Sequence, residues 1–399
     1  MSSQNFLPYG RQTIDDADID AVVDVLRGDY LTTGPTAAAF ETAFAEQVEA
    51  PHAIVVSSGT AALHLAALAL NLGPDDCVIV PTITFLATAN AIRLTGADVV
   101  FADVDPETAL LSPACFEAAI DQARTKSVSA VFPVHMNGQP CDMDALGAIA
   151  ARHGIEIVED ACHALGGTIG DQPVGNGLKS RMTMFSLHPV KAIAMGEGGV
   201  LTTADDSFDK RLRDLRNHGI VRDPDRFTNT SAALDASGEP HSWYYEMQEP
   251  GLNYRASDIH CALGLSQLYK LEKFHARRTR LADLYDDALR TLAPVLKPAS
   301  RVAWGRSGWH LYPVLINYEA AGLTRDNTMA ALRSRGIGSQ VHYFPVHRQP
   351  YYERRYGKTV LPGAEAYFAR CLSLPLFPSM TDDDIQRVAQ GLSEVLGTA

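Results

Sequence analysis

MTMFSLHPVKAIAMGEGGVLTT, residues 182–203, predicts two short strands joined by a loop that carries one lysine. One apolar run ends at Ser186 and another begins at Val200, with Lys191 and a glycine-rich turn between them. An amine held between two buried strands loses hydration, so its pKa falls and the neutral form that makes an imine becomes accessible. This is the chemistry of a pyridoxal phosphate (PLP) Schiff base. A solvated loop lysine is the commoner explanation of any single lysine, so the interpretation depends on the rest of the chain.

Bulk composition limits the classes of partner. The 399 residues are 46% hydrophobic and 20% charged, which predicts a globular chain long enough for one large and one smaller domain. The chain has 47 acidic residues and 34 Lys and Arg, which gives a net charge of -13. This negative charge argues against nucleic acid or an acidic membrane as partner. Six cysteines without a CxxC spacing, and no leader-like or membrane-length apolar run, lead us to expect a cytoplasmic protein.

Strand-like and helix-like runs alternate through the first half of the chain. Such alternation predicts an α/β fold with a mostly parallel sheet, sandwiched by helices, that binds its ligand at the carboxyl ends of the strands. Expected strands span residues 53–56, 77–80, 98–102, 128–134 and 155–158, and expected helices span 61–70, 84–94, 113–123 and 143–153.

Three loops that follow expected strands carry candidate ligand-binding residues. Between a strand and an apolar helix, Ser57-Ser-Gly-Thr60 offers free backbone N–H groups to a phosphate, although Ser58 or Thr60 could simply cap the helix. Phe85 could stack on a flat cofactor or belong to the core. Asp160 needs a cationic partner such as a protonated pyridine, unless it caps the next turn.

The flanking segments predict additional helices and a second domain. An amphipathic helix should begin at Thr13 and end at Gly28, and it should pack its apolar stripe on the domain that follows. Residues 221–247 are polar and irregular, which is typical of a mobile or functional loop. We expect a large domain over residues 1–270 and a smaller α+β domain over 271–399, with strands at 310–316 and 338–343 and closing helices near 364–371 and 382–396.

The motifs, taken together and in order, resemble one known family over nearly the whole chain. It is the DegT/DnrJ/EryC1/StrS group of PLP-dependent sugar aminotransferases, which have the type I aminotransferase fold. The motifs that carry the resemblance are Ser58-Gly-Thr-Ala-Ala-Leu63, Thr84-Phe85 with Ala87-Thr-Ala-Asn90, Glu159-Asp160-Ala-Cys-His-Ala164, Phe185-Ser-Leu-His-Pro-Val-Lys191, Gly196-Glu-Gly-Gly199 and Asn253-Tyr-Arg255.

The resemblance implies a role for each matching residue. Lys191 would be the imine lysine and Asp160 the partner of the pyridine nitrogen, and these two are the expected catalytic residues. The other cofactor-binding residues would be Phe85 on the ring, Gly59, Thr60 and Ser186 on the phosphate, Asn253 reaching that phosphate from a second subunit of a homodimer, and His163 near the phenolic oxygen unless it is a satisfied core histidine. The expected substrate-binding residues are Tyr9, Asp29, Tyr30, Leu31, Thr32, His342, Tyr343, Phe344 and Pro345.

Within the family, further runs resemble enzymes of pseudaminic-acid-type biosynthesis. They are Asn217-His-Gly-Ile-Val221, His310-Leu-Tyr-Pro313 and Gln340-Val-His-Tyr-Phe-Pro345. The resemblance implies that L-glutamate converts PLP to pyridoxamine phosphate (PMP), which then aminates C4 of a UDP-linked 4-keto-6-deoxy-N-acetylhexosamine. The long 221–247 loop and Glu249-Pro-Gly-Leu252 depart from the family pattern near the expected substrate entrance, so they put the identity of the sugar in question.

Other functions remain open to the sequence. Another nucleotide-sugar 3- or 4-aminotransferase would use the same residues, and a non-catalytic PLP-binding regulator could share the scaffold. Family members that dehydrate a sugar have histidine in place of Lys191, which argues against that reaction here. We expect no metal site, since His342 and His347 have no further ligands near them in the sequence.

Overall fold

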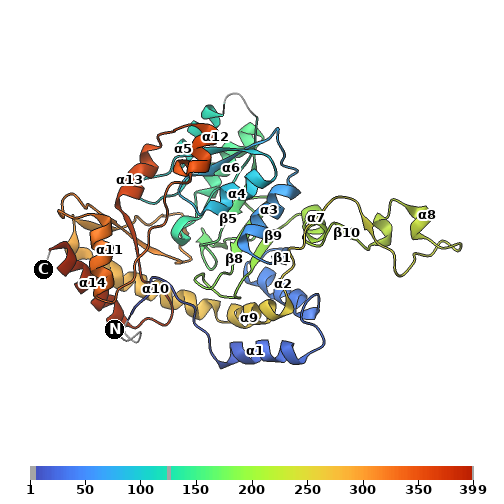
Figure 1. The fold of residues 1–399 in the computed structure, drawn as a ribbon, viewed down its shortest axis with the longest axis horizontal. Coiled ribbons are helices and arrows are strands. Elements are labelled where there is room, and N and C mark those ends of the chain that lie inside the picture. The colour runs from blue at the N-terminus through green and yellow to red at the C-terminus, as the bar shows by residue number, and fades with distance from the viewer. Residues whose placement is uncertain (1–5, 124–126, 398–399) are drawn as a thin grey trace.

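The computed structural model describes residues 6–123 and 127–397 (Figure 1). A seven-stranded sheet forms its centre, in the order β1-β9-β8-β5-β4-β2-β3. Its four pairs from β8 to β3 are parallel, whereas β9 runs antiparallel to both β8 and β1, so the expected mostly parallel sheet is confirmed. The strands are β1 His52–Val56, β2 Cys77–Pro81, β3 Asp98–Ala102, β4 Val128–Val131, β5 Glu156–Asp160, β8 Met182–Ser186 and β9 Gly199–Thr203.

Both faces of this sheet are buried because alternate side chains of one strand enter two different apolar clusters. In β1, Ile54 and Val56 pack into one cluster, and Ala53 and Val55 pack into the other. Helices cover both faces and connect the strands (Figure 1). They are α2 Pro35–Gln47, α3 Gly59–Ala69, α4 Leu86–Leu94, α5 Pro113–Gln122, α6 Met143–His153, α7 Asp206–Arg216 and α9 Asp258–Leu268.

The first helix, α1 Asp16–Arg27, packs on α9 through the face that carries the buried Asp18, and the half-buried Val22 and Val25 lie on the same face. Asp15 caps it, two residues later than expected, and the buried Asp18 accepts hydrogen bonds from Ser266 Oγ and Gln267 Nε2, each at 2.7 Å. The same Gln267 receives the Ala194 amide through its Oε1 at 3.4 Å. Ile19 and Leu26 of the expected stripe are 53% and 55% exposed, so the expectation that the whole stripe packs on the following domain is wrong.

The C-terminal part has its own sheet and apolar cluster. Its antiparallel strands are β12 Leu296–Pro298, β14 Tyr312–Ile316 and β15 Cys371–Leu374, in the order β12-β14-β15. Packed around them or against the large sheet are α10 Leu271–Ala288, α11 Arg325–Ser334, α12 Pro350–Tyr356, α13 Pro362–Arg370 and α14 Asp382–Leu396. A further small sheet joins β6 Thr168–Ile169, β7 Gln172–Pro173 and β13 Gly305–Arg306.

The strand expected at residues 338–343 does not form. Along this segment the backbone changes partner, because the Gly338 amide donates to Leu7 and the Gln340 amide to Ser373. No single neighbour supplies a continuous ladder, and only an isolated bridge at Gln340 results. The prediction was therefore wrong about the strand.

The boundary expected after residue 270 stays a prediction. Along α10 the apolar side chains pack into two different clusters. Leu271 and Phe274 belong to the cluster that contains Ala53 and Val55 of β1, whereas Leu281 and Tyr285 belong to the C-terminal cluster. We propose the two-domain division on this change of contacts.

Residues 220–249 form an arm that stands out from the body (Figure 1). The pair β10 Ile220–Val221 and β11 Glu246–Met247 forms its base, and it contains α8 Thr230–Ala233. Glu246 organises it by accepting the amides of Thr228 and Asn229, which lower its pKa to about 2. The loop expected to be irregular is therefore hydrogen-bonded internally, yet Trp243 remains 68% exposed.

In the part of the chain that the structure describes, no helix combines the length and apolar character needed to span a membrane.

Candidate active site

A cavity of about 550 Å³ opens where several strands of the large sheet end. The turns after β1, β2, β5 and β8 all contribute side chains to it, as expected for a ligand site of an α/β sheet. It brings together ten of the residues predicted from the sequence: Tyr9, Gly59, Thr60, Phe85, Asp160, His163, Ser186, Lys191, His342 and Tyr343.

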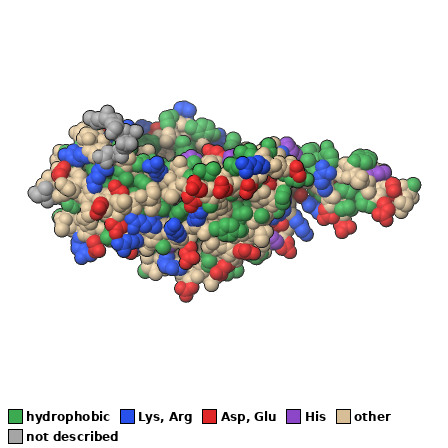
Figure 2. Space-filling view, turned by 90° about the horizontal axis from the view of Figure 1, so that it is seen from below, with side chains coloured by type: hydrophobic (Ala, Val, Ile, Leu, Met, Phe, Trp, Pro, Cys, Tyr) green, Lys and Arg blue, Asp and Glu red, His purple; other side chains and the backbone are tan. Residues whose placement is uncertain are grey.

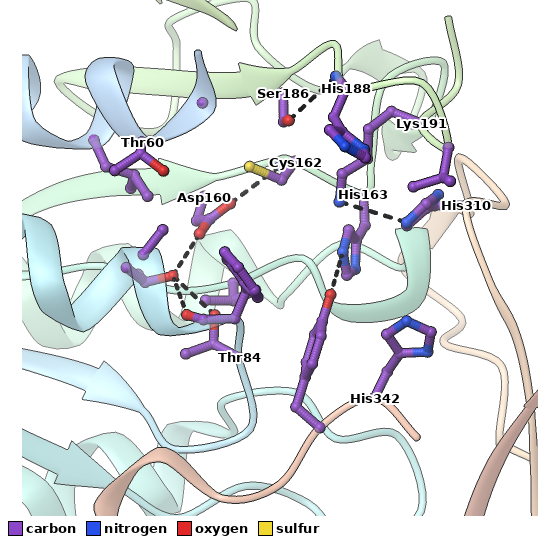
Figure 3. Close-up of a pocket in the computed structure, with 18 of the residues that line it drawn as sticks. Thr60, Thr84, Asp160, Cys162, His163, Ser186, His188, Lys191, His310 and His342 are labelled. Atoms are coloured by element: carbon purple, nitrogen blue, oxygen red, sulfur yellow. Dashed lines mark hydrogen bonds between the residues drawn. The ribbon is translucent and has the colours of Figure 1, made fainter. Parts of the chain in front are cut away.

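Lys191 lies on the loop between the paired strands β8 and β9, and its side chain enters the cavity (Figure 3). Its amide donates to the His188 carbonyl at 2.8 Å, and its Nζ lies 3.4 Å from His310 Nε2. Burial of the amine lowers its pKa, and the nearby Cys162 and Asp160 oppose that shift. The structure thus places a desolvated amine in the cavity, as an imine-forming lysine requires.

Asp160 ends β5 with its carboxylate buried at the cavity wall. One oxygen accepts from Thr88 Oγ1 at 2.8 Å, and the other accepts from the Cys162 amide at 3.1 Å. Asp160 therefore caps the next turn and also lines the cavity. A buried carboxylate that receives these neutral donors retains capacity for a cationic partner, which a protonated pyridine nitrogen would provide.

The adjacent acid, Glu159, points to the other side of β5 and is satisfied within the protein. His135 Nε2 lies 2.7 Å from it, and the hydroxyls of Ser180 and Thr183 donate to it at 2.5 and 3.1 Å. The Cys141 amide donates to His135 Nδ1, so that nitrogen accepts and Nε2 carries the proton toward Glu159.

The N-terminus of α3 forms an anion cradle next to Ser186. Ser58 caps the helix by accepting the Ala61 amide at 3.1 Å, which confirms the capping interpretation for that residue. The next amides, of Gly59 and Thr60, have no intrahelical acceptor and lie at the positive end of the helix dipole. A Cβ at position 59 would lie 2.9 Å from Ser186 Cβ, so this close approach requires glycine. The arrangement fits a phosphate group.

Buried imidazoles line the opposite wall. His163 Nε2 lies 3.2 Å from the Tyr343 hydroxyl, and the rings of His163 and His310 are 4.4 Å apart. Burial lowers the pKa of both well below the ordinary histidine value, and it lowers that of His342 to about 3. Nδ1 of His163 and of His310 has no partner among the described residues, so His163 is not a satisfied core histidine.

The ring of Phe85 stands at the cavity edge and is 58% exposed. It precedes α4, and its nearest aromatic neighbour is Tyr343, with ring centroids 6.1 Å apart. An exposed ring over a buried carboxylate and a phosphate cradle fits a flat cofactor that stacks on it. Together with the unpartnered histidine nitrogens, the residues present therefore fit PLP.

Other predicted residues lie outside this cavity. Asn253 is exposed and bridges to Asn217, and the turn of Asp29, Tyr30, Leu31 and Thr32 lies against the start of α9, where the Leu31 carbonyl accepts the Asp258 amide. Phe344 and Pro345 are not among the lining residues either. The roles expected for these residues stay predictions.

Several lining residues were missed by the sequence analysis. Thr88 follows Phe85 by three positions on a helix, so helical periodicity could have indicated it. His310 and Gln340 come from distant parts of the chain, and no local pattern signals their position. His188, Glu197 and Cys162 complete this group. The described residues contain no group of three or more His, Cys, Asp or Glu side chains arranged to hold a metal ion.

A buried lysine, a buried acid and an anion cradle in one cavity fit a PLP-dependent aminotransferase of the type I fold. The model of the DegT/DnrJ/EryC1/StrS aminotransferase family matches residues 12–393, and the chain belongs to this family. Family membership confirms the resemblance found in the sequence, together with PLP as cofactor and sugar aminotransferase as the class of enzyme.

Solved structures agree over almost the full length. PseC of Helicobacter pylori, an aminotransferase of pseudaminic acid biosynthesis, has a TM-score of 0.87 and 26% identity, covering 99% of this chain and 100% of its own. Spr1654 of Streptococcus pneumoniae, described as a sugar aminotransferase and solved in a PLP form, has a TM-score of 0.86 and 28% identity, covering 98% and 99%. DesI, solved with its TDP-sugar product, has a TM-score of 0.85 and 31% identity, covering 99% and 94%.

Proposed function

We propose that this enzyme transfers the amino group of L-glutamate to C4 of a UDP-linked 4-keto-6-deoxy-N-acetylhexosamine in pseudaminic-acid-type biosynthesis. The observation that carries the proposal is the end-to-end similarity to PseC, and the residues of the cavity that fit PLP support it. A cytoplasmic location forms part of the proposal, since all six cysteines are free thiols.

Bound PLP supplies an electron sink for the substrate carbon, and the protein's residues direct it. Asp160 holds the proton on the pyridine nitrogen. Lys191 would anchor the cofactor through its amine and, as a free amine, would take up and return the proton of the substrate carbon. Gly59, Thr60 and Ser186 fix the phosphate, and Phe85 holds the ring plane.

The sugar nucleotide must be held largely by neutral donors of this subunit. Among the residues that line the cavity, Lys191 is the single Lys or Arg, and it is committed to the cofactor. Tyr9, His342 and Tyr343 supply hydroxyl and imidazole groups. A diphosphate therefore needs additional donors from outside the cavity of one chain.

We propose that a second copy of the chain supplies them in a homodimer. The outward stripe of α1 leaves Ile19 53% and Leu26 55% exposed, and Figure 2, seen from the side of α1, shows hydrophobic side chains on this face and on the arm. Apolar surface of this kind is typical of a subunit interface. The exposed Asn253 lies at the base of the arm, outside its own cavity, as a residue that serves the partner's cofactor would.

A second candidate substrate is a TDP-linked keto sugar. DesI, whose structure contains a TDP-sugar product, is 31% identical to this chain, against 26% for PseC. The arm near the expected substrate entrance differs from the family pattern, so specificity for the nucleotide and the sugar is the part of the proposal most in need of a test.

The test is a mass-spectrometric product assay with UDP- and TDP-linked 3-keto and 4-keto sugars and L-glutamate. We expect a 4-amino sugar from the UDP-linked 4-keto-N-acetyl substrate, and neither product nor visible absorbance of lysine-bound cofactor with Lys191→Ala. Amination of a TDP-linked sugar alone would favour the second candidate. A Lys191→Ala protein that keeps turnover would contradict the role of the lysine.

A further inference from the structure

Arg278 is a buried cation that no part of the site described above uses. It lies on α10 and is 1% exposed. Among the described residues no carboxylate pairs with it, and burial alone lowers its pKa to about 10. Removing a guanidinium from water without a counter-charge costs several kcal/mol, so its environment must compensate by other means.

The compensation comes from four main-chain carbonyls. Nη1 donates to the carbonyls of Leu376, Trp309 and His310 at 2.8, 3.2 and 3.3 Å. Nη2 reaches the carbonyl of Lys191 at 3.4 Å. One rigid, planar group thus joins the lysine loop, the segment before β14 and the segment after β15.

The segment around His310 is also held from its other side. The Gly308 amide donates to the Gly138 carbonyl at 2.8 Å, and a Cβ at position 138 would lie 2.7 Å from the Trp309 nitrogen. Trp309 itself adopts a φ of +48°, a conformation that an L-residue keeps only when its surroundings impose it. Arg278 and the glycine turn therefore clamp this segment between them.

We infer that Arg278 is a positioning residue for the transamination: its guanidinium fixes the main chain of Lys191 and of His310 together, so that the Lys191 amine meets the His310 imidazole. This inference rests on the proposed function for its catalytic meaning, since the Lys191 amine is the group that anchors the cofactor and moves the proton. The contact of 3.4 Å between Nζ and Nε2 is the geometry that Arg278 maintains (Figure 3).

Electrostatics work in the same direction. Lys191, His163, Arg278 and His342 face His310. Burial lowers the pKa of His310 most, and positive charge on these neighbours, permanent on Arg278, lowers it further. A neutral imidazole can accept a hydrogen bond from the Lys191 amine, whereas an imidazolium would repel the ammonium form. Arg278 thereby favours both the position and the protonation state of its neighbour.

The experiment measures Lys191 directly in cofactor-free protein. Competitive labelling of amines with acetic anhydride across pH, followed by mass spectrometry of the Lys191 peptide, gives the pKa of this amine without any turnover. The variants are Arg278→Met, Arg278→Lys and Arg278→Ala. The control is Arg277→Met, because Arg277 is the next residue on α10 but pairs with Asp382 at 2.6 Å, away from the cavity.

Because burial is what lowers the pKa of Lys191, loosening of its loop in Arg278→Met should admit water and raise that pKa by about one unit, so labelling near pH 8 should fall about tenfold. Turnover of the holoenzyme should fall about 10- to 100-fold in kcat with little change in KM, since misplacement of a reacting group by about 1 Å costs on that order. The acid limb of the pH profile should move to higher pH as His310 loses the repulsion of Arg278. Arg277→Met should leave all three unchanged.

Arg278→Lys keeps the positive charge but loses the planar guanidinium. The acid limb of the pH profile of this variant should therefore stay in place while kcat falls. Millimolar guanidinium should restore labelling and kcat to Arg278→Ala, and it should not affect Arg277→Met. If Arg278→Met fails to fold, Arg278→Lys and the guanidinium rescue decide the matter. Wild-type labelling of Lys191 and kcat within threefold in the folded variants would overturn the inference. Because labelling needs no cofactor or sugar, failure of the proposed function would leave this result readable.

Discussion

The cofactor wall of the cavity and its substrate entrance differ in the share of their expected residues that a single chain supplies. At the wall, strand ends place Lys191, Asp160 and the α3 cradle within a buried environment whose hydrogen bonds come from the same chain. At the entrance, Phe85 is exposed and no Arg is among the described residues that line the cavity. The predicted Asp29–Thr32 turn and Asn253 lie elsewhere.

This contrast indicates that the cofactor wall, more than the substrate entrance, requires a rigid arrangement. Chemistry on PLP is common to all members of the family, and it needs groups held within a fraction of an ångström. Recognition of a particular nucleotide sugar can be assembled from loops and from a second subunit, since loops carry most of the variation in a fold. Substitutions at the wall should therefore lower the rate of every substrate, and those at the entrance should act on selected ones.

The largest effect should come from Asp160→Asn. An amide cannot stabilise the protonated pyridine nitrogen, so we expect kcat to fall by about 10²–10⁴-fold, the range of a lost acid–base or electrostatic group. Single-turnover kinetics with L-glutamate measure this loss independently of the sugar.

Glu159→Gln is the matched control, because this neighbour is buried on the other side of the same strand. It should lower thermal stability and leave kcat within a few-fold. Equal losses of kcat in both variants would mean that disturbance of β5, and not loss of the Asp160 carboxylate, lowers the rate.

A smaller effect, and a sharper test of the entrance, comes from Asn253→Ala. Loss of one hydrogen bond to a phosphate should weaken cofactor binding by about 10- to 100-fold. In mixed dimers with Lys191→Ala chains, the site that keeps Lys191 would receive Asn253 from its partner. Those dimers should regain about half of the wild-type activity, measured after separation by two different affinity tags.

The outcome of mixing separates two geometries. If Asn253 served the cavity of its own chain, each mixed dimer would have one site without Lys191 and one without Asn253. Activity would then be about half that of the Asn253→Ala protein, since only one of the two sites keeps Lys191, and the shared site would be refuted.

The smallest effect concerns the buried imidazoles of the wall. Folding keeps His342 neutral down to about pH 3, whereas the unfolded chain protonates its histidine near pH 6.5. The unfolded state then binds more protons, so the free energy of unfolding falls as the pH drops through this window. Between pH 7 and 5.5 the His342 contribution is about 1 kcal/mol.

Denaturant titrations of the cofactor-free protein and of His342→Gln measure this contribution. The wild-type protein should lose about 1 kcal/mol more than the variant over that interval. Parallel pH profiles for the two proteins would show that His342 is protonated in the folded state.

Local sequence patterns were sufficient for the strand ends and the residues on them. Lys191, Asp160 and Gly59 were found because glycine turns, apolar runs and a buried acid signal their own environment. The contact face of α1 was not predicted. An apolar stripe indicates burial but not whether the stripe packs on its own chain or on another, and the hydrogen bonds of the buried Asp18 fix which side of the helix faces α9. His310 stands in a run that the sequence analysis quoted, but its place beside Lys191 was not predicted, and neither was that of Arg278. Contacts across more than 80 residues depend on tertiary packing that periodicity does not encode.

The hairpin formed by β8 and β9 has a mechanical consequence for the lysine it carries. Both ends of the loop are anchored in the interior of the large sheet, and Arg278 pins the carbonyl at its centre. Because hydrogen bonds hold the main chain at both ends of the loop and at Lys191, movement of the amine depends on rotation about the four methylene groups of its side chain. A nitrogen tethered in this way would reach only positions within one side-chain length of a fixed backbone.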